Sequence, residues 1–140
     1  MKKLILILLM PLAFVSQAAE FIKPNRFQLD QIDDSTTPSK ASKKAAKKLI
    51  ESYRTRVLKG ELMSDLAMKF SEDPGSAENG GRYDDMARGM MVPEFEKVAF
   101  NLKPNEISKV FETVYGYHFI QCIEIKGDII SVRHILVVPK

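Results

Sequence analysis

Apolar side chains recur with two different periods along the first half of this chain. Residues 27–32, "FQLDQI", alternate apolar and polar positions, which predicts a half-buried strand. A helix is then expected between a capping serine, Ser39 or Ser42, and Gly60 at its C-terminal end. Its expected buried side consists of Ala46, Leu49, Tyr53 and Val57. A second, shorter helix has a helical apolar spacing that predicts burial of Met63, Leu66, Ala67 and Phe70.

The second half of the chain begins with a loop of turn-forming residues, 71–81, and then favours strands. Residues 82–91 are expected to carry one short strand. Pro93 suits the first position of a helix whose buried side is Phe95, Ala99 and Leu102. Further strands are predicted at 107–113, 115–125 and 129–140. Because the turns between these strands are too short for crossovers, the strands must be antiparallel and the fold α+β.

The N-terminal residues have the pattern of a secretory signal peptide. Lys2 and Lys3 precede an apolar run from Leu4 to Val15, and small residues follow up to Ala18. The apolar run is shorter than the ~20 residues that a membrane span needs, which favours cleavage over a membrane anchor. We therefore expect a signal peptide at 1–18, an irregular leader at 19–26, a main domain at 27–126 and a C-terminal strand extension at 127–140. The mature protein would reside in a bacterial periplasm or cell envelope.

Charge and cysteine content exclude some classes of function. The net charge is +3, and lysines cluster at 40–48 on one predicted helix. Nucleic-acid binding would need aromatic platforms or a known motif beside that charge, so we interpret the cluster as a solvated face. Cys122 is the only cysteine and lies in an apolar strand, while His118 and His134 have no partners at metal-ligand spacing. No cofactor, metal or nucleic acid is therefore expected.

Four segments in the second half of the chain resemble one known family. They are "FSEDPGSAENGG" at 70–81, "RGMMVPEFEKVAFNL" at 88–102, "EIS" at 106–108 and "ETVYGYHFIQ" at 112–121. In this order and spacing they are similar to the parvulin peptidyl-prolyl cis-trans isomerases, and most similar to the modules of exported chaperones of the SurA and PrsA kind. The resemblance implies an FKBP-like fold, a four-stranded antiparallel sheet wrapped by helices, here with an extra C-terminal strand.

The resemblance also implies a shallow cleft that holds a proline of a bound peptide. The apolar side of this cleft would consist of Met91, Phe95 and Tyr83, the last at a position where the family usually has leucine. The polar, catalytic side would consist of Asp73, Thr113, His118 and Gln31. Gln31 stands in the place of the family's first histidine. From the residues alone, Asp73 could equally cap the turn in its loop, and Phe95 could be ordinary core.

The expected function is isomerisation of X-Pro bonds in unfolded, exported polypeptides, with chaperone-like binding of these chains. Members that require a phosphorylated residue before proline carry a basic cluster in the loop after the first strand. Here that loop, "DDSTTPSK", begins with two acidic residues, which favours substrates without phosphate. An alternative is a weak or inactive peptide-binding module, because Gln31 cannot titrate as a histidine does. A third is an interaction domain that forms a homodimer by exchanging its last strand.

The closing strand, with "SVRHILVVPK" at its end, looks like the opening strand of a parvulin module at the wrong end of the chain. It is either the remnant of a second module or a strand that pairs with residues 117–125, and pairing is expected because an unpaired apolar strand invites aggregation. A two-residue turn at Gly127 and Asp128 is favoured, and it would place His118 and His134 on opposite faces of the sheet. A three-residue turn would place them on the same face.

Overall fold

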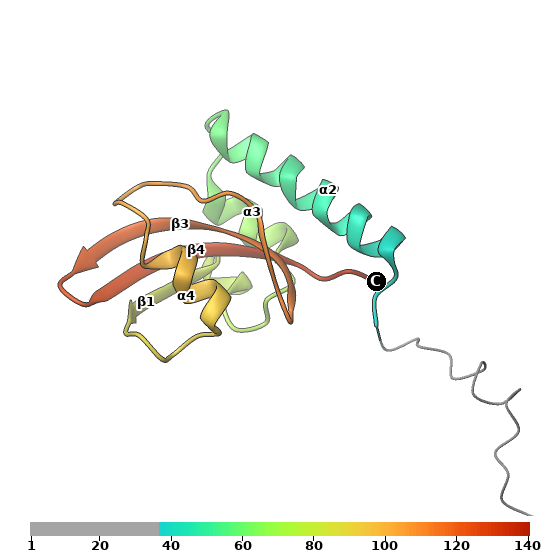
Figure 1. The fold of residues 1–140 in the computed structure, drawn as a ribbon. Coiled ribbons are helices and arrows are strands. Elements are labelled where there is room, and N and C mark those ends of the chain that lie inside the picture. The colour runs from blue at the N-terminus through green and yellow to red at the C-terminus, as the bar shows by residue number, and fades with distance from the viewer. Residues whose placement is uncertain (1–36) are drawn as a thin grey trace, which may run out of the picture. The chain divides into compact units, whose positions relative to one another are not determined.

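Figure 1 shows the computed structural model, which describes residues 37–140 as an antiparallel sheet with helices packed against it. In chain order the elements are α2 (Lys40–Leu58), α3 (Met63–Phe70), the 3-10 helix η1 (Ala77–Asn79), β1 (Arg82–Met86), α4 (Pro93–Ala99), β2 (Phe111–Thr113), β3 (Gly116–Lys126) and β4 (Ile129–Val137). The predicted strand at 27–32, Gln31, the leader and the signal peptide lie outside the described residues. Among residues 37–140, no helix is long and apolar enough to cross a membrane.

The four strands form one sheet in the order β1-β4-β3-β2, and all neighbours are antiparallel. The expected four-stranded antiparallel sheet is thus confirmed. The closing strand β4 lies inside this sheet, between β1 and β3, and is one of the four described strands rather than an addition to them. The prediction that it pairs with residues 117–125 is also confirmed. Since both of its edges are paired within one chain, β4 needs no second copy to satisfy its backbone.

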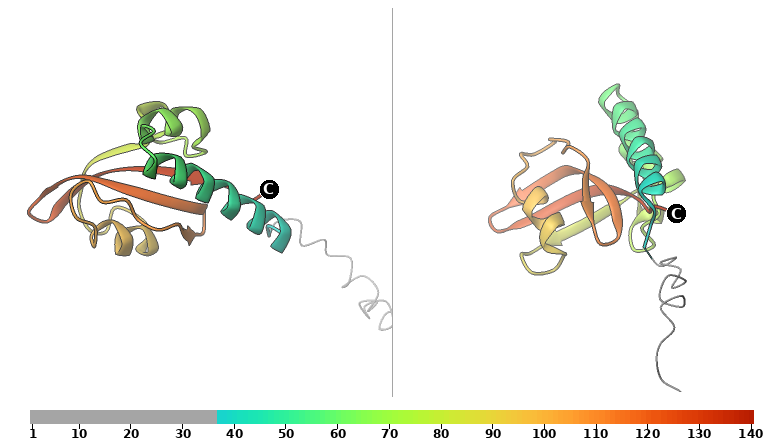
Figure 2. Two further views of the ribbon diagram at one scale, coloured as in Figure 1. Left: turned by 90° about the horizontal axis from the view of Figure 1, so that it is seen from above. Right: turned by 45° about the vertical axis from the view of Figure 1, so that its right-hand side comes forward.

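Each face of the sheet carries its own apolar core, and Figure 2 shows helices on both sides. On one face, α2 and α3 pack on alternate residues of the central strands, namely Tyr117, Phe119, Ile135 and Val137. On the other face, α4 packs on the intervening residues, namely Ile120, Cys122, Ile130 and Val132. This alternation follows from the period of two along a strand. The second face, beneath α4, is also the one that carries His118 and His134.

Helix α2 begins and ends as its sequence predicts, but its buried stripe is shifted. Ser39 is the N-cap and accepts a hydrogen bond from the Ser42 amide at 3.1 Å, and Gly60 follows the last turn with a φ of +104°. The buried side chains are Ala46, Ile50, Tyr53 and Val57. Leu49, which was expected in this set, is 45 % exposed. At 100° per residue, position 50 lies closer than position 49 to the line through 46, 53 and 57, so Ile50 takes the central place.

The remaining elements agree with their predicted positions and differ in length. The predicted strand at 107–113 is reduced to β2, while Ile107 makes only an isolated bridge to Gln121. Helix α3 buries Met63, Leu66 and Ala67, whereas Phe70 at its end is 38 % exposed and stacks on Tyr53. Helix α4 has Pro93 in its first turn and buries Phe95 and Ala99 as expected. It ends at Ala99, so Leu102 is buried beyond the helix and not on it.

Candidate active site

The two histidines lie on the same face of the sheet because the β3–β4 hairpin contains a bulge. Its turn has two residues, as predicted, with Lys126 opposite Ile129 and a φ of +59° at Gly127. Between Cys122 and Glu124 the register shifts by one residue, so that Ile123 is unpaired and His118 faces Leu136. A shift by one residue reverses the face of every side chain beyond it. The expectation that the histidines lie on opposite faces is therefore wrong, although the turn itself was predicted correctly.

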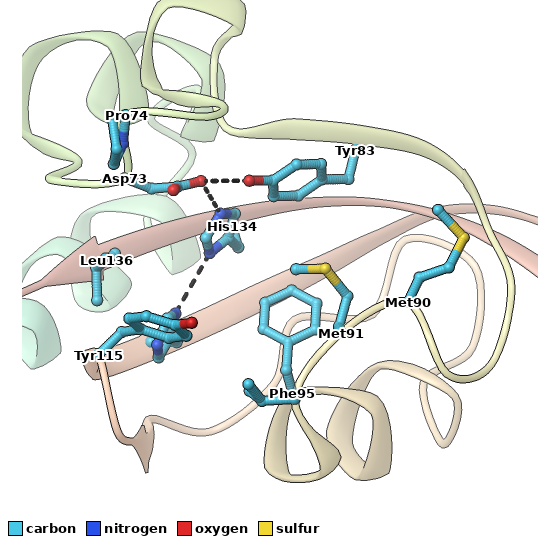
Figure 3. A pocket seen from close by; sticks show the side chains of 11 residues that line it. Asp73, Pro74, Tyr83, Met90, Met91, Phe95, Tyr115, His134 and Leu136 are labelled. Atoms are coloured by element: carbon cyan, nitrogen blue, oxygen red, sulfur yellow. Dashed lines mark hydrogen bonds and ion pairs between the residues drawn. The ribbon is translucent and has the colours of Figure 1, made fainter.

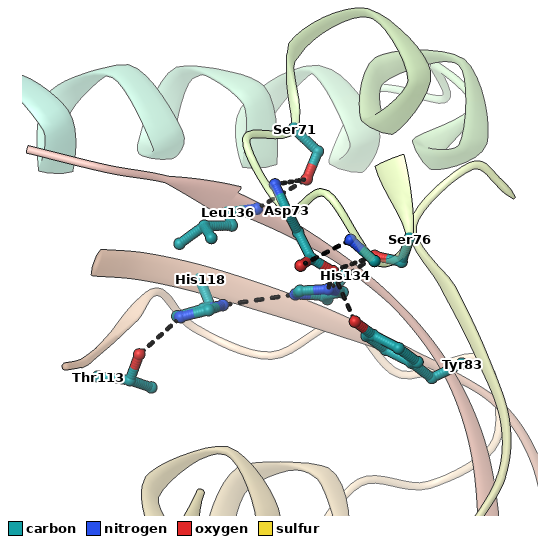
Figure 4. Close-up of polar contacts among 9 residues, drawn as sticks. Ser71, Asp73, Ser76, Tyr83, Thr113, His118, His134 and Leu136 are labelled. Atoms are coloured by element: carbon teal, nitrogen blue, oxygen red, sulfur yellow. Dashed lines mark hydrogen bonds and ion pairs between the residues drawn. The ribbon is translucent and has the colours of Figure 1, made fainter. Parts of the chain in front are cut away.

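A chain of hydrogen bonds runs through both histidines, as Figure 4 shows. Thr113 Oγ1 lies 2.8 Å from His118 Nε2, and His118 Nδ1 lies 3.4 Å from His134 Nδ1. At the other end, His134 Nε2 lies 2.8 Å from Asp73 Oδ2. Thr113 Oγ1 also accepts from the Tyr115 amide at 3.1 Å, and its hydroxyl hydrogen can be donated to His118 Nε2. With both rings neutral, each proton then has one consistent place, on His118 Nδ1 and on His134 Nε2.

His118 is held in its neutral form by burial. Its ring is 4 % exposed, and this desolvation, followed by the neighbouring His134, lowers the pKa of His118 to about 4. It stacks on the ring of Phe111 with centroids 5.4 Å apart, while Phe95 meets it edge-on. An uncharged imidazole at this position can donate and accept hydrogen bonds without a counter-ion.

Asp73 ends the chain of hydrogen bonds as an ionised carboxylate. The hydrogen bond from His134 is the main cause that holds its pKa well below the usual range, and hydrogen bonds from Ser76 and Tyr83 act in the same direction. Asp73 Oδ2 accepts from the Ser76 hydroxyl and, at 2.9 Å, from the Tyr83 hydroxyl. Its second oxygen accepts from the Gly75 amide at 3.3 Å. The turn-capping role and the contact with His134 are thus combined in one side chain.

The loop after α3 is attached to β4, and this attachment sets Asp73 beside His134. The Glu72 amide donates to the Leu136 carbonyl at 2.9 Å, and the Leu136 amide donates to Ser71 Oγ at 3.2 Å. Further along the loop, the His134 amide donates to the Gly81 carbonyl at 2.8 Å. A side chain at Gly81 would collide with the backbone of His134, and its φ is +77°. Glycine is therefore required where the loop approaches the strand so closely.

An apolar pocket of about 370 Å³ opens beside the series of hydrogen bonds that runs from Thr113 to Asp73. Figure 3 shows Met91 and Phe95 on one side of it, across from Tyr83 and His134. Phe95 is 1 % exposed, so it belongs to the core and to the pocket wall at once. The other lining residues are Asp73, Pro74, Met90, Val92, Tyr115, His118 and Leu136. Apolar and adaptable walls of this kind suit the ring of a proline.

Met91 is positioned by the first turn of α4. The Glu96 carboxylate accepts from the Gly89 amide at 2.6 Å and from the Met91 amide at 3.0 Å. Two otherwise unpaired amides of the preceding loop are satisfied in this way, and the loop is fixed against the helix. The methionine side chain is thereby directed towards the pocket.

The structure brings together most of the residues that the sequence singled out. Five of them line the pocket, namely Asp73, Tyr83, Met91, Phe95 and His118. Thr113 lies behind them and contacts His118, and Gln31 lies outside the described residues.

Two residues of this hydrogen-bonded series, His134 and Ser76, were not predicted as site residues. The "HILV" run that begins at His134 resembles the family's opening strand, but the predicted two-residue turn without a bulge placed His134 on the opposite face from His118 and so outside the site. Ser76 is 1 % exposed, and its hydroxyl lies 3.0 Å from His134 Nε2 as well as contacting Asp73. Nothing in the pattern of the loop identified it. Within residues 37–140, no three His, Cys, Asp or Glu side chains are arranged to hold a metal ion.

Comparisons with known proteins place the chain in a family. Residues 26–124 match the family model of the rotamases, described as the PPIC-type PPIase domain. The foldase protein PrsA of Caldanaerobacter subterraneus subsp. tengcongensis is 46 % identical over 77 residues, which cover 55 % of this chain and 25 % of that protein. The chaperone SurA of Alcanivorax borkumensis is 47 % identical over 62 residues, which cover 44 % of this chain and 14 % of that protein.

A crystal structure of the peptidylprolyl isomerase PrsA from Bacillus cereus aligns with 67 % of this chain and 31 % of its own, at 30 % identity and a TM-score of 0.49. The chain thus spans about a quarter of the first of these relatives and less of the SurA protein. The family model, in contrast, matches well over half of the chain, although it ends before β4. The chain belongs to the PPIC-type peptidyl-prolyl isomerase family, the parvulins.

Proposed function

We propose that this protein is a peptidyl-prolyl cis-trans isomerase that acts on X-Pro bonds of unfolded, exported polypeptides. The observation that carries the proposal is the apolar pocket between Met91, Phe95 and Tyr83, with a buried pair of histidines beside it, of which His118 is uncharged. The pocket would hold the proline ring, and the hydrogen-bonded series would face the peptide bond that precedes it.

Isomerisation of an X-Pro bond requires no covalent step. Rotation about an X-Pro bond is opposed by amide resonance, with a barrier of ~18–20 kcal/mol. The planar amide is more polar than the twisted transition state, so a poorly solvated pocket favours the twisted form. His118, His134 and Asp73 line the pocket. An imidazole N–H of the histidine pair can donate to the carbonyl oxygen as it turns, whereas the ionised Asp73 can only accept and would act by orienting His134. Nothing in this scheme needs Asp73 as a nucleophile.

The composition of the pocket supports substrates without phosphate. None of the residues that line it is lysine or arginine. A phosphoserine or phosphothreonine before the proline would bring close to two negative charges beside the ionised Asp73, without a basic partner in the lining. The acidic start of the loop at 33–40 supports the same conclusion.

Two features support the binding of unfolded chains in the cell envelope. Two of the residues that line the pocket are exposed apolar side chains, Met90 at 62 % and Tyr115 at 61 %, and Val114, the chain neighbour of Tyr115, is 84 % exposed. Exposed apolar side chains of this kind can hold apolar segments beside a proline. The N-terminal pattern of charge, apolar run and small residues supports export, and the two relatives named above carry the names foldase and chaperone.

The alternative of an inactive peptide-binding module rested on Gln31 at the place of a histidine. His134 supplies an imidazole at contact distance from His118, and this supports the active form of the proposal. The two functions are separated by an assay that follows cis-trans exchange of a short X-Pro peptide by NMR, without a coupled protease. Exchange faster than in buffer supports the isomerase. Binding of the peptide with no gain in exchange rate would leave only the binding module.

The same assay tests substrate class. Two peptides are compared that differ only in having serine or phosphoserine before the proline. The protein should accelerate cis-trans exchange of the serine peptide at least as much as that of the phosphoserine peptide. A strong preference for the phosphorylated peptide would contradict the proposal. Sequencing of the N-terminus of protein from the cell envelope tests export, since cleavage is expected after residue 18 or 19.

A further inference from the structure

The hydroxyl of Tyr83 has a partner that an apolar pocket wall would not require. Tyr83 lies on β1, and its ring lies beside His134, with centroids 5.4 Å apart and the planes tilted by 31°. Beyond the ring, its hydroxyl reaches Asp73 Oδ2 at 2.9 Å. Burial, followed by the hydrogen bond to Asp73, raises the pKa of Tyr83 to about 12, so this group remains a protonated donor near neutral pH.

Gly75 leaves room for this contact. A Cβ atom built at Gly75 would lie only 2.7 Å from the Tyr83 hydroxyl oxygen, closer than carbon and oxygen can approach without displacement. The same glycine donates its amide to Asp73 Oδ1 at 3.3 Å. Gly75 and Tyr83 therefore form a matched pair around the Asp73 carboxylate, one through its backbone and one through its hydroxyl.

The carboxylate that they hold determines where the protons of the histidine pair reside. Asp73 Oδ2 can only accept, so it keeps a proton on His134 Nε2 and leaves His134 Nδ1 as the acceptor for His118. If Asp73 rotated away, His134 Nε2 would face only the Ser76 hydroxyl, which can donate as well as accept. Either tautomer of His134 would then be satisfied.

We infer that Tyr83 is a positioning residue, which together with Gly75 holds the Asp73 carboxylate against His134 and so keeps the histidine pair in one tautomer. As far as it concerns turnover, this inference rests on the proposed isomerase function. Tyr83 acts through Asp73, and its ring serves separately as pocket wall. Removing the Tyr83 hydroxyl alone should therefore change the isomerisation rate of the bound peptide and leave the affinity for the peptide nearly intact.

The test uses Tyr83→Phe, which keeps the ring and removes the donor, and Gly75→Ala, which displaces the donor and keeps Tyr83. Tyr53→Phe is the matched control, since it loses a tyrosine hydroxyl in the core beneath α2, away from the pocket. The first readout is the set of imidazole ¹⁵N shifts of His118 and His134 in the free protein. The second is kcat and KM for the X-Pro peptide.

In the unaltered protein, each imidazole should show one protonated and one unprotonated nitrogen. Tyr83→Phe and Gly75→Ala should both move the His134 shifts towards the average of two tautomers and lower kcat by about tenfold, the effect of one hydrogen bond to a charged group, with KM little changed. The double variant should be no worse than either single variant, because both remove the same contact. Tyr53→Phe should match the unaltered protein.

Unchanged ¹⁵N shifts in both Tyr83→Phe and Gly75→Ala would overturn the inference, whatever the activity. Averaged shifts with an unchanged kcat would overturn the claim that this positioning matters for turnover. If the unaltered protein has no isomerase activity, the proposed function fails, and the shifts of the free protein still decide whether Tyr83 holds the histidine pair. Fully additive effects of Gly75→Ala and Tyr83→Phe would show that the two residues do not act through one contact.

Discussion

The Nδ1 atoms of His118 and His134 lie 3.4 Å apart, although 16 residues and a complete hairpin separate them in the chain. They occupy neighbouring central strands, and each has its own polar partner on the far side, Thr113 for one and Asp73 for the other. This pairing makes the last strand of the described chain part of the site, and it determines what several variants should do.

Met91→Ala should weaken binding of the X-Pro peptide and raise KM, because it removes an apolar wall of the pocket that is not essential to the core. The lost apolar contact should weaken the free energy of peptide binding by ~2 kcal/mol, a value for a half-buried side chain. The measurement is kcat and KM by NMR exchange. Met68→Ala, on an exposed side of α3, is the control and should leave both constants unchanged. An unchanged KM in Met91→Ala would exclude this side chain from substrate binding.

Asp73→Ala and His118→Ala should lower kcat and leave peptide affinity largely intact. His118 is proposed to act on the turning amide and Asp73 to act through His134, whereas binding of the proline ring depends on the apolar walls of the pocket. Titration of peptide binding by NMR, beside the exchange rate, separates the two effects. An equal loss of affinity and rate would indicate that these side chains only shape the cleft.

Stability should fall as the pH is lowered from about 6.5 to about 4, because of His118. The pKa of His118 is lowered to about 4 from the ordinary value of 6.5, so the unfolded chain takes up this proton at a higher pH than the folded chain. The contribution is fully present above 6.5 and is lost progressively down to 4, by up to about 3 kcal/mol. Urea unfolding at several pH values measures it. His118→Gln should flatten this part of the curve, and an equally steep curve in that variant would assign the effect to another group.

Deletion of residues 129–140 should unfold the domain. β4 supplies Ile130 and Val132 to one core and Ile135 and Val137 to the other, so its loss exposes both faces of the sheet and leaves β1 unpaired. Circular dichroism and amide exchange report the loss. Deletion of 138–140 alone is the control, because it removes only the residues beyond β4, and it should remain folded. A stable, folded protein without 129–140 would mean that the strand is dispensable.

Much of this structure could be predicted from local patterns. The helical spacing of apolar residues located α2, α3 and α4, and Ser39, Gly60 and Pro93 marked their ends, because caps and breakers act within one turn of the chain. The Gly127-Asp128 turn was likewise local. The motif segments were sufficient to indicate the family and to select Asp73, His118, Met91 and Phe95, since these residues lie in one continuous stretch of similarity.

Tertiary structure alone decided which side chains meet. A bulge at Ile123 has no distinct sequence signal, yet it reverses the face of every residue beyond it and brings His118 to the side of His134. Asp73 and Ser76, which contact each other within one turn of the loop, reach His134 only because this loop is bonded to β4, some 60 residues further along the chain. The place of β4 between β1 and β3 depends on the burial of apolar residues on two opposite faces at once. Sequence by itself determined the elements and the family, whereas long-range packing determined the register and therefore the site.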